Sequence, residues 1–398
     1  MKVEADHNEE PLNTQETAIA ARRLSRWLAI AGRVLWLELI SGFALLSAYV
    51  FIQRLGGDNP GADFIIYYAA SLLTLGGDPG AIFSWPALQE AQAGVIGKTI
   101  DYLPWLYPPP LLLLAAPLSA LPYIPALGFW IAAQLAMLAA AVRTLGGTGW
   151  TILAAFVFPA TINNILVGQN GALSAALLGG GLALLNRHPA IAGVLFGLLI
   201  YKPHLAILLP FALLAASAWR ALAAALASAL GASLLSMAVF GMEPWSAFLA
   251  STSAGTKALE YGSAHWPKMA TVFAALRLLG AEVSLAYAGQ GIAALFAVVA
   301  VVLIWRRRQA RSWRAPALII ATFLATPYAF FYDLVVLIFA ILWLQRPGLS
   351  QGGRMILALL WLAPVALWLL ARYSQISLWP LLLAGCLAWI YSQARKAE

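Results

Sequence analysis

Long apolar runs fill the chain from residue 34 onward, and short polar segments mark the points where these runs break. The clearest breaks are residues 63–68, 107–110, 168–170, 201–204 and 326–333. They carry carboxylates, tyrosines, amides and a lysine, which are costly at membrane depth and usually line a site when they occur there. The runs therefore predict helices that cross a membrane, and the breaks predict a shared polar site.

Composition supports this prediction. The 398 residues are 62% hydrophobic and 10% charged, with a mean hydropathy of +0.82, whereas a soluble domain has about 25% charged residues. The net charge of +8 fits cations that flank the cytoplasmic ends of spans better than a nucleic-acid surface, and no nucleic-acid partner is expected. The single cysteine, Cys386, excludes an internal disulfide. No Cys/His spacing indicates a metal, and no cofactor is expected.

A spanning helix needs about 20 apolar residues, and the runs break at glycine, proline and charge. We expect an all-α, polytopic membrane protein with about twelve transmembrane helices. Two further apolar stretches, Leu111–Leu121 and Met269–Leu279, are short and are expected to be re-entrant or interfacial. The predicted spans are Val34–Ile52, Ile124–Val142, Trp150–Val167, Ala172–Leu185, Ala190–Tyr201, Leu205–Ala218, Ala221–Phe240, Ser284–Trp305, Ala315–Ala325, Phe330–Leu344, Met355–Leu370 and Ile376–Tyr391.

The cations fall on one side of the membrane if both termini are cytoplasmic. This predicts cytoplasmic tails at residues 1–33 and 394–398, one transmembrane domain at 34–393, and extracytoplasmic loops at 54–106 and 241–268. Residues 18–33 are read as leading into a retained anchor and not into a cleaved signal. Every polar break then faces outward. The cations used are Arg22, Arg23, Arg26, Arg33, Arg143, Arg187, Arg220, Arg306, Arg307, Arg308, Arg311, Arg314, Arg346, Arg354, Arg395 and Lys396.

Asp63 has two interpretations. It follows a Gly-rich turn and precedes an amphipathic stretch that ends at Leu75, a position where aspartate is a good helix N-cap. The same carboxylate could serve as a general base that takes a proton from an acceptor hydroxyl.

The other polar residues also have ordinary explanations. Tyrosines are common at membrane interfaces, amides end helices, and a lysine at an interface can snorkel. Lys202 is less ordinary because it lies on the face that the other cations avoid, where a lone lysine suits a phosphate. Pro327 breaks a helix and frees backbone groups to face a cavity. The candidate substrate-binding residues are Tyr67, Tyr68, Tyr107, Gln169, Asn170, Lys202, His204, His265, Lys268, Tyr328, Tyr332 and Asp333.

The ordered motifs resemble glycosyltransferase family 87, the DUF2029 group of membrane enzymes with the GT-C fold. In the mannosyltransferase branch of that family the last motif carries a histidine pair, whereas this chain reads Tyr328 to Asp333 without one. The motifs are Gly61-Ala62-Asp63-Phe64, Tyr67-Tyr68-Ala69-Ala70, Tyr107-Pro108-Pro109, Gly168-Gln169-Asn170-Gly171, Ala192-Gly193 to Lys202-Pro203, and Thr326-Pro327 to Tyr332-Asp333.

This resemblance implies a hexosyltransferase in the cytoplasmic (inner) membrane with its site facing the periplasm or exterior. The donor would be a sugar, often mannose, on a polyprenyl monophosphate, and the acceptor a lipid or glycan among the membrane lipids. Asp63 matches the position of the proposed base of an inverting displacement. Two other classes are alternatives: a secondary transporter or lipid-linked-sugar flippase, which predicts internal repeats and polar residues at the midplane, and a ligase or polymerase with a diphosphate donor.

Overall fold

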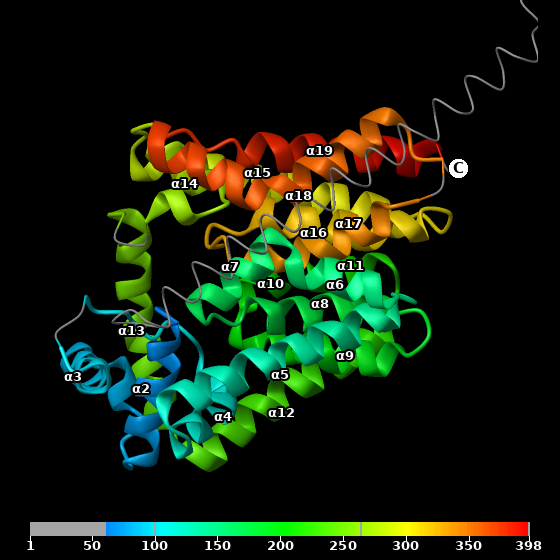
Figure 1. Ribbon diagram of the computed structural model, residues 1–398. Helices are drawn as coiled ribbons and strands as arrows, with labels where there is room; N and C mark the ends of the chain where they lie inside the picture. The colour runs from blue at the N-terminus through cyan, green and yellow to red at the C-terminus, as the bar shows by residue number, and fades with distance from the viewer. Residues whose placement is uncertain (1–60, 99–100, 263–264, 347, 397–398) are drawn as a thin grey trace, which may run out of the picture. The chain divides into compact units, whose positions relative to one another are not determined.

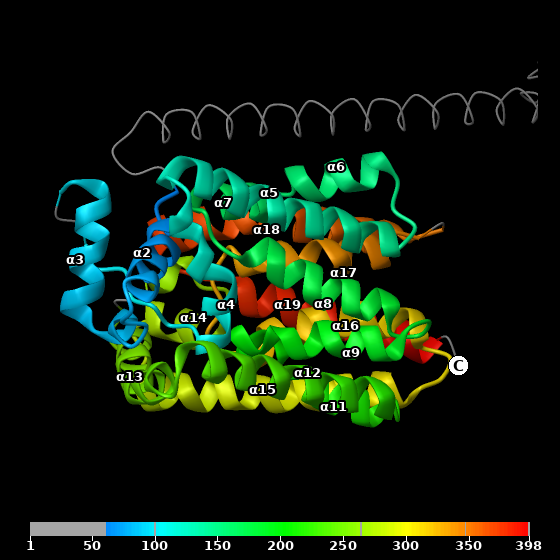
Figure 2. The same ribbon diagram turned by 90° about the horizontal axis from the view of Figure 1, so that it is seen from below.

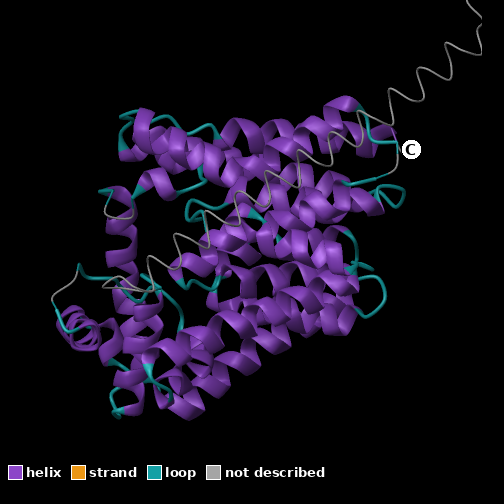
Figure 3. Cartoon of the chain, viewed as in Figure 1, coloured by secondary structure: helices purple, strands orange, loops and turns teal. Residues whose placement is uncertain are grey.

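Helices account for nearly all regular structure, as the apolar runs predict. The computed structural model describes residues 61–98, 101–262, 265–346 and 348–396 (Figure 1). No strand occurs within these ranges (Figure 3). Met269 and Phe330 form an isolated β-bridge between two loops. In chain order the α-helices are α2 (Phe64–Leu75), α3 (Trp85–Ile96), α4 (Leu112–Ala115), α5 (Tyr123–Thr144), α6 (Gly149–Val157), α7 (Pro159–Val167), α8 (Gly171–Leu184), α9 (Pro189–Gly197), α10 (Pro203–Ala206), α11 (Leu209–Ala215), α12 (Trp219–Phe240), α13 (Glu243–Glu260), α14 (Val272–Leu278), α15 (Val283–Arg306), α16 (Arg311–Ala325), α17 (Leu337–Leu344), α18 (Gln351–Ser374) and α19 (Trp379–Lys396). The 3₁₀-helices are η1 (Ala81–Phe83), η2 (Pro109–Leu111), η3 (Ala116–Ala120), η4 (Leu198–Tyr201), η5 (Trp266–Lys268) and η6 (Asp333–Val336).

Four helices of the described part, α5, α12, α15 and α18, are long and apolar enough to cross a membrane. Each contains one of the predicted spans. The predicted span Trp150–Val167 is not one straight helix, because α6 and α7 bend by 60° at Pro159, whose ring disfavours a helical residue before it. Counting that pair gives up to five spans. The total of about twelve is not confirmed, and Val34–Ile52 lies outside the described residues.

The two short apolar stretches are helical. Residues 109–120 form η2, α4 and η3 in succession, and α14 has seven residues, a length of about 10 Å at 1.5 Å per residue. Both are shorter than the roughly 20 residues that a span requires. They stay candidates for re-entrant or interfacial helices.

Helix α8 lies in the interior and positions the polar residues that precede it. It is buried continuously from Gly171 to Leu182, and it packs between α5 and α9 (Figure 2). Gly179 and Gly181 make room for the rings of Phe339 and Phe196, because a Cβ at either glycine would collide with the ring. The N-terminus of α8 is thereby fixed inside the protein.

Helices α9 and α12 approach each other closely through small residues. Gly193 and Gly197 are four residues apart on α9 and face the backbone carbonyls of Ala221 and Ala225 on α12, where an added Cβ would clash. Small residues at this spacing let membrane helices pack backbone to backbone. The contact fixes α9, and with it the helix interruption at Lys202, which lies between η4 and α10.

Candidate active site

The turn between α7 and α8 brings the first two polar segments together. Gly168 ends α7 in the left-handed region (φ 71°), a conformation that glycine adopts without strain. A Cβ at Gly168 would lie 2.6 Å from Cβ of Phe64, so glycine also permits the close approach of α2. The Asp63 amide donates to the Val167 carbonyl at 2.8 Å, which joins the start of α2 to the end of α7.

Gln169 connects Asp63 to two tyrosines. Its Nε2 donates to Asp63 Oδ2 at 3.0 Å, and its Oε1 accepts hydrogen bonds from the hydroxyls of Tyr67 at 2.5 Å and Tyr107 at 3.0 Å. Because the tyrosines occupy the carbonyl oxygen, the amide nitrogen is directed at the carboxylate. We call Asp63, Tyr67, Tyr107 and Gln169 the amide cluster.

The structure bears on the capping interpretation of Asp63. The residue occupies the N-cap position of α2, but its backbone is helical (φ −94°, ψ −13°) and its side chain makes no capping hydrogen bond. A capping residue usually has extended backbone angles and a side-chain oxygen that accepts from the first turn. The carboxylate is turned toward Gln169 instead. Helix α2 is buried on all faces from Phe64 to Ser71 and exposes Leu72 and Leu75 near its end, so the expected amphipathic pattern is absent from its first two turns.

Two side chains of α5 hold the α7–α8 turn, and sequence reasoning missed both. Trp130 Nε1 donates to the Gly168 carbonyl at 3.1 Å, and Gln134 Nε2 donates to the Gln169 carbonyl at 3.0 Å. The sequence does carry a signal for Gln134, which is an amide inside the predicted span Ile124–Val142. The structure buries this side chain. Polar side chains inside spans usually face the protein interior and carry a role.

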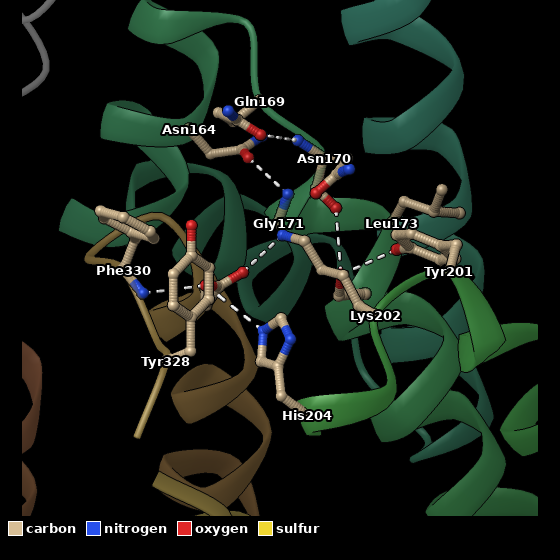
Figure 4. Close-up of polar contacts among 12 residues, drawn as sticks. Asn164, Gln169, Asn170, Gly171, Leu173, Tyr201, Lys202, His204, Tyr328 and Phe330 are labelled. Atoms are coloured by element: carbon tan, nitrogen blue, oxygen red, sulfur yellow. Dashed lines mark hydrogen bonds and ion pairs between the residues drawn. The ribbon is translucent and has the colours of Figure 1, made fainter. Parts of the chain in front are cut away.

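Lys202 and Asp333 form a buried ion pair (Figure 4). Lys202 Nζ lies 2.5 Å from Asp333 Oδ1, and the two side chains are 3% and 1% exposed. Asp333 Oδ2 accepts from the Phe330 amide at 2.9 Å, and His204 Nε2 lies 4.0 Å away. The expectation of a lone, phosphate-sized cation at Lys202 therefore needs correction, because a carboxylate 131 residues further along the chain neutralises it.

Burial determines the protonation of the groups around this pair. It lowers the pKa of Lys202, and Asp333 beside it acts in the opposite direction. It lowers the pKa of His204 to about 4, so this imidazole is neutral at pH 7. Burial raises the pKa values of Tyr107 and Tyr328 because an apolar environment disfavours the charged phenolate. Both tyrosines keep their hydroxyl protons.

Tyr107 joins the ion pair to the amide cluster. Its hydroxyl bonds Gln169, and its ring centroid lies 5.9 Å from Lys202 Nζ. The Tyr332 ring centroid lies 5.0 Å from the same nitrogen. A Cβ at Gly171, the first residue of α8, would collide with the Tyr332 carbonyl, so the N-terminus of α8 meets the late motif directly. These contacts therefore bring residues of all five polar breaks together.

Asn170 lies at the centre of this arrangement with unused hydrogen-bonding capacity. The residue is fully buried, and neither Oδ1 nor Nδ2 has a hydrogen-bond partner among the described residues. Its neighbour Asn164 uses Oδ1 to accept from the Gly171 amide at 2.6 Å (Figure 4). Buried amides without partners are rare in folded proteins, and a bound ligand would supply the missing ones.

Three predicted site residues lie elsewhere. Tyr68 donates to the Leu121 carbonyl at 3.0 Å and packs edge-on against Tyr123. His265 and Lys268 line a separate cavity of about 380 Å³ with Pro267, Trp368 and Arg372. Within the described ranges, no group of three or more His, Cys, Asp or Glu side chains could hold a metal ion.

Several helices are long and apolar enough to cross a membrane, and they surround a buried group of carboxylate, amide and tyrosine side chains. These features define a helical membrane protein with a polar interior. A sequence profile described as glycosyltransferase family 87 matches residues 105–327, which is more than half of the chain. The chain belongs to glycosyltransferase family 87 and is a membrane glycosyltransferase. No curated protein and no solved structure gave a match. The matched region includes Tyr107, Gln169 and Lys202, whereas Asp63 precedes it and Asp333 follows it.

Proposed function

We propose that the protein transfers a hexose from a polyprenyl monophosphate to a hydroxyl of a lipid or glycan, with inversion at the anomeric carbon and Asp63 as the general base. One observation carries this proposal: the Asp63 carboxylate does not cap its helix and is oriented by Gln169. The carboxylate accepts a hydrogen bond from the neutral Gln169 amide, which orients it without occupying it with a proton.

The reaction balances with these residues. The acceptor oxygen forms a bond to the anomeric carbon from the face opposite the phosphate, and its proton passes to Asp63. The bond between the anomeric carbon and the phosphate oxygen breaks, and the electron pair leaves with the phosphate. A phosphate monoester leaves as a stable anion and needs no proton from the enzyme. One positioned base of this kind contributes about 10²- to 10⁴-fold in rate.

The remaining site residues position the sugar in this proposal. Asn170 would exchange its unmet hydrogen bonds for those of sugar hydroxyls, which both donate and accept. Tyr107, Tyr328 and Tyr332 supply rings and hydroxyls around it. The Lys202–Asp333 pair fixes the late motif against the break after η4, and neutral His204 packs edge-on against Tyr328 at a centroid distance of 5.8 Å.

The direct test is transfer by purified protein. Polyprenyl phosphates that carry mannose, glucose or galactose are each incubated with the enzyme and a membrane-lipid extract, and glycosylated product is detected by mass spectrometry. We expect product with one donor and none from the Asp63→Asn variant. Absence of transfer from every monophosphate donor, with transfer from a diphosphate donor, would refute the proposed donor class.

The proposal places the site on the extracytoplasmic face and both termini in the cytoplasm, as the cation distribution predicts. Single cysteines introduced at Lys268 and Arg308 in a Cys386→Ala background test this placement. A membrane-impermeant thiol reagent should label position 268 in intact cells, and position 308 only after permeabilisation. The reverse pattern would refute the orientation.

A further inference from the structure

A group of arginines lies at one end of the C-terminal helices. Five of them occupy residues 306–314, across the end of α15 and the start of α16, and Arg346 follows the end of α17. These segments come together because α16 packs against α15, α17 and α19 (Figure 2). We call Arg306, Arg307, Arg308, Arg311, Arg314 and Arg346 the basic cluster.

Helix α16 separates the basic cluster from the late polar motif. It runs from Arg311 to Ala325, which is 15 residues or about 22 Å at 1.5 Å per residue. Asp333 lies beyond the far end of this helix, where it pairs with Lys202. The basic cluster is therefore a surface distinct from the proposed transfer site.

Hydrogen bonds and aromatic rings hold Arg346 in place. Its Nη2 donates to the Ser312 carbonyl at 2.6 Å, its Nη1 lies 3.2 Å from Ser312 Oγ, and its guanidinium carbon lies 3.9 Å from the Trp313 ring centroid. Trp313 packs edge-on against Trp389 of α19 at a centroid distance of 5.8 Å. The connection after α17, the start of α16 and helix α19 are thereby joined around this arginine.

Arg314 is held in a similar way. Trp305 Nε1 donates to the Arg314 carbonyl at 3.0 Å, and Arg314 Nη2 donates to the Arg307 carbonyl at 3.1 Å. Burial and the neighbouring charge of Arg311 lower the pKa of Arg314. Its Nε is buried and has no hydrogen-bond acceptor among the described residues. The fold thus keeps like charges close together and leaves one guanidinium donor unmet.

This part of the chain supplies almost no negative charge. Residues 283–397 contain one acidic residue, Asp333, and it is already paired with Lys202. Like charges held this closely repel one another, and an anion bound between them removes that repulsion. Among the described residues, no carboxylate forms an ion pair with Arg306, Arg308, Arg311, Arg314 or Arg346.

Part of this charge has an ordinary explanation, because arginines flank the cytoplasmic ends of membrane helices. Arg143, Arg187 and Arg220 fit that explanation, since each is exposed and is the single arginine of its helix connection. Membrane orientation requires charge alone. It does not require the stacked rings and hydrogen bonds that fix Arg314 and Arg346.

The basic cluster adjoins apolar surface at the ends of two membrane-length helices. Helices α15 and α18 are both long and apolar enough to cross a membrane. Leu303 lies one turn before Arg307 on α15 and is exposed, as is Met355 in the first turn of α18. A ligand that covers both kinds of surface has a negatively charged head and an apolar tail.

We propose that the basic cluster binds the phosphate headgroup of an anionic membrane phospholipid. Guanidinium groups present paired N–H donors that match phosphate oxygens, and basic clusters beside membrane helices bind acidic lipid headgroups. Exposed Arg306, Arg308 and Arg311 supply charge, while Arg314 and Arg346 form a fixed floor. This inference goes beyond the proposed function, because it involves neither the sugar donor nor the acceptor.

Lipid binding is measured on the full-length protein without a sugar donor. Purified protein in detergent is titrated with phosphatidylglycerol, and bound lipid is counted by native mass spectrometry. We expect the combined variant Arg306→Gln, Arg308→Gln and Arg311→Gln to bind this lipid about tenfold to a hundredfold more weakly. Phosphatidylcholine, whose headgroup has no net charge, should bind this variant and the wild type equally.

The matched control removes the same charge at the single-arginine connections. It combines Arg143→Gln, Arg187→Gln and Arg220→Gln, and it should bind phosphatidylglycerol within twofold of the wild type. Arg314→Lys keeps the positive charge but removes the Nε donor, and should weaken binding several-fold.

The outcomes separate a lipid site from topological charge. The assignment is overturned if the cluster variant and the control bind phosphatidylglycerol equally while their unfolding temperatures are unchanged. It is also overturned if glycerol phosphate, which lacks the acyl chains, displaces the lipid at equal concentration, because the cluster would then be a site for soluble anions. An Arg314→Lys variant that binds like the wild type would remove the fixed geometry from the assignment.

Discussion

Asp63 and Asp333 are two aspartates whose side chains make different hydrogen bonds. Asp63 accepts a hydrogen bond from the Gln169 amide, and two tyrosines orient that amide. Asp333 contacts the Lys202 ammonium and a backbone amide, and it is 1% exposed. A carboxylate paired with a buried cation gives up that pairing if it accepts a proton, whereas a carboxylate held by an amide keeps its hydrogen bond. In the proposed mechanism, this difference makes Asp63 the proton acceptor and Asp333 a positioning residue.

The largest expected effect concerns Asp63→Asn. Asparagine keeps the shape and can still accept the Gln169 hydrogen bond, but it cannot take a proton. We expect kcat to fall by about 10²- to 10⁴-fold with the unfolding temperature and donor binding unchanged. Asp78→Asn makes the same chemical change at an exposed carboxylate and should be silent. Turnover near the wild-type rate in Asp63→Asn would remove Asp63 from the mechanism.

Asp333→Asn should lower the free energy of unfolding, whereas Asp63→Asn should lower kcat. It leaves Lys202 buried without a counter-charge, a change that typically costs about 3–5 kcal/mol. The double variant Lys202→Met with Asp333→Leu removes both charges and should recover most of the unfolding free energy, measured by denaturant titration in detergent. A single variant destabilised by less than about 1 kcal/mol would show that the pair is not charged in the folded protein.

Substitutions at Gln169 and Tyr107 test how strongly the amide cluster contributes to orienting Asp63. Gln169→Met keeps the length and removes the hydrogen bond to a charged group, which is worth about 1.5–3 kcal/mol. We expect kcat/KM to fall by about tenfold to a hundredfold in a steady-state transfer assay. Tyr107→Phe removes one neutral hydrogen bond to Gln169 and should cost about tenfold or less. Equal losses in the two variants would contradict the proposed hierarchy.

The smallest expected effect is on pH dependence through His204. Its folded-state pKa of about 4 lies below the ordinary value of about 6.5, so between these pH values the unfolded chain binds more protons than the folded one. The free energy of unfolding should therefore fall as the pH drops from 6.5 toward 4, by about 1–2 kcal/mol from this residue. This is less than the full pKa shift would give, because solvent screens a side chain that is 20% exposed. His204→Asn should flatten the pH dependence of the unfolding temperature, whereas exposed His188→Asn should not.

Much of the site could be predicted from the sequence because polar residues are rare in an apolar chain. Asp63, Tyr107, Gln169 and Lys202 stand out as polar breaks, and the structure gathers them around one turn. Gln134 was missed although it is an amide inside a predicted apolar span. Trp130 could not be found, because only the fold places its indole N–H beside the Gly168 carbonyl.

The sequence by itself determined that this chain is helical, membrane-embedded and a member of its family, since hydropathy and ordered motifs are local properties. Only the tertiary structure decided which groups share a hydrogen bond or a charge. Lys202 reads as a lone cation until the fold places Asp333 beside it, and Asp63 reads as a helix cap until its backbone angles and Gln169 show otherwise. Pairing across more than a hundred residues depends on helix packing in three dimensions, which no local pattern encodes.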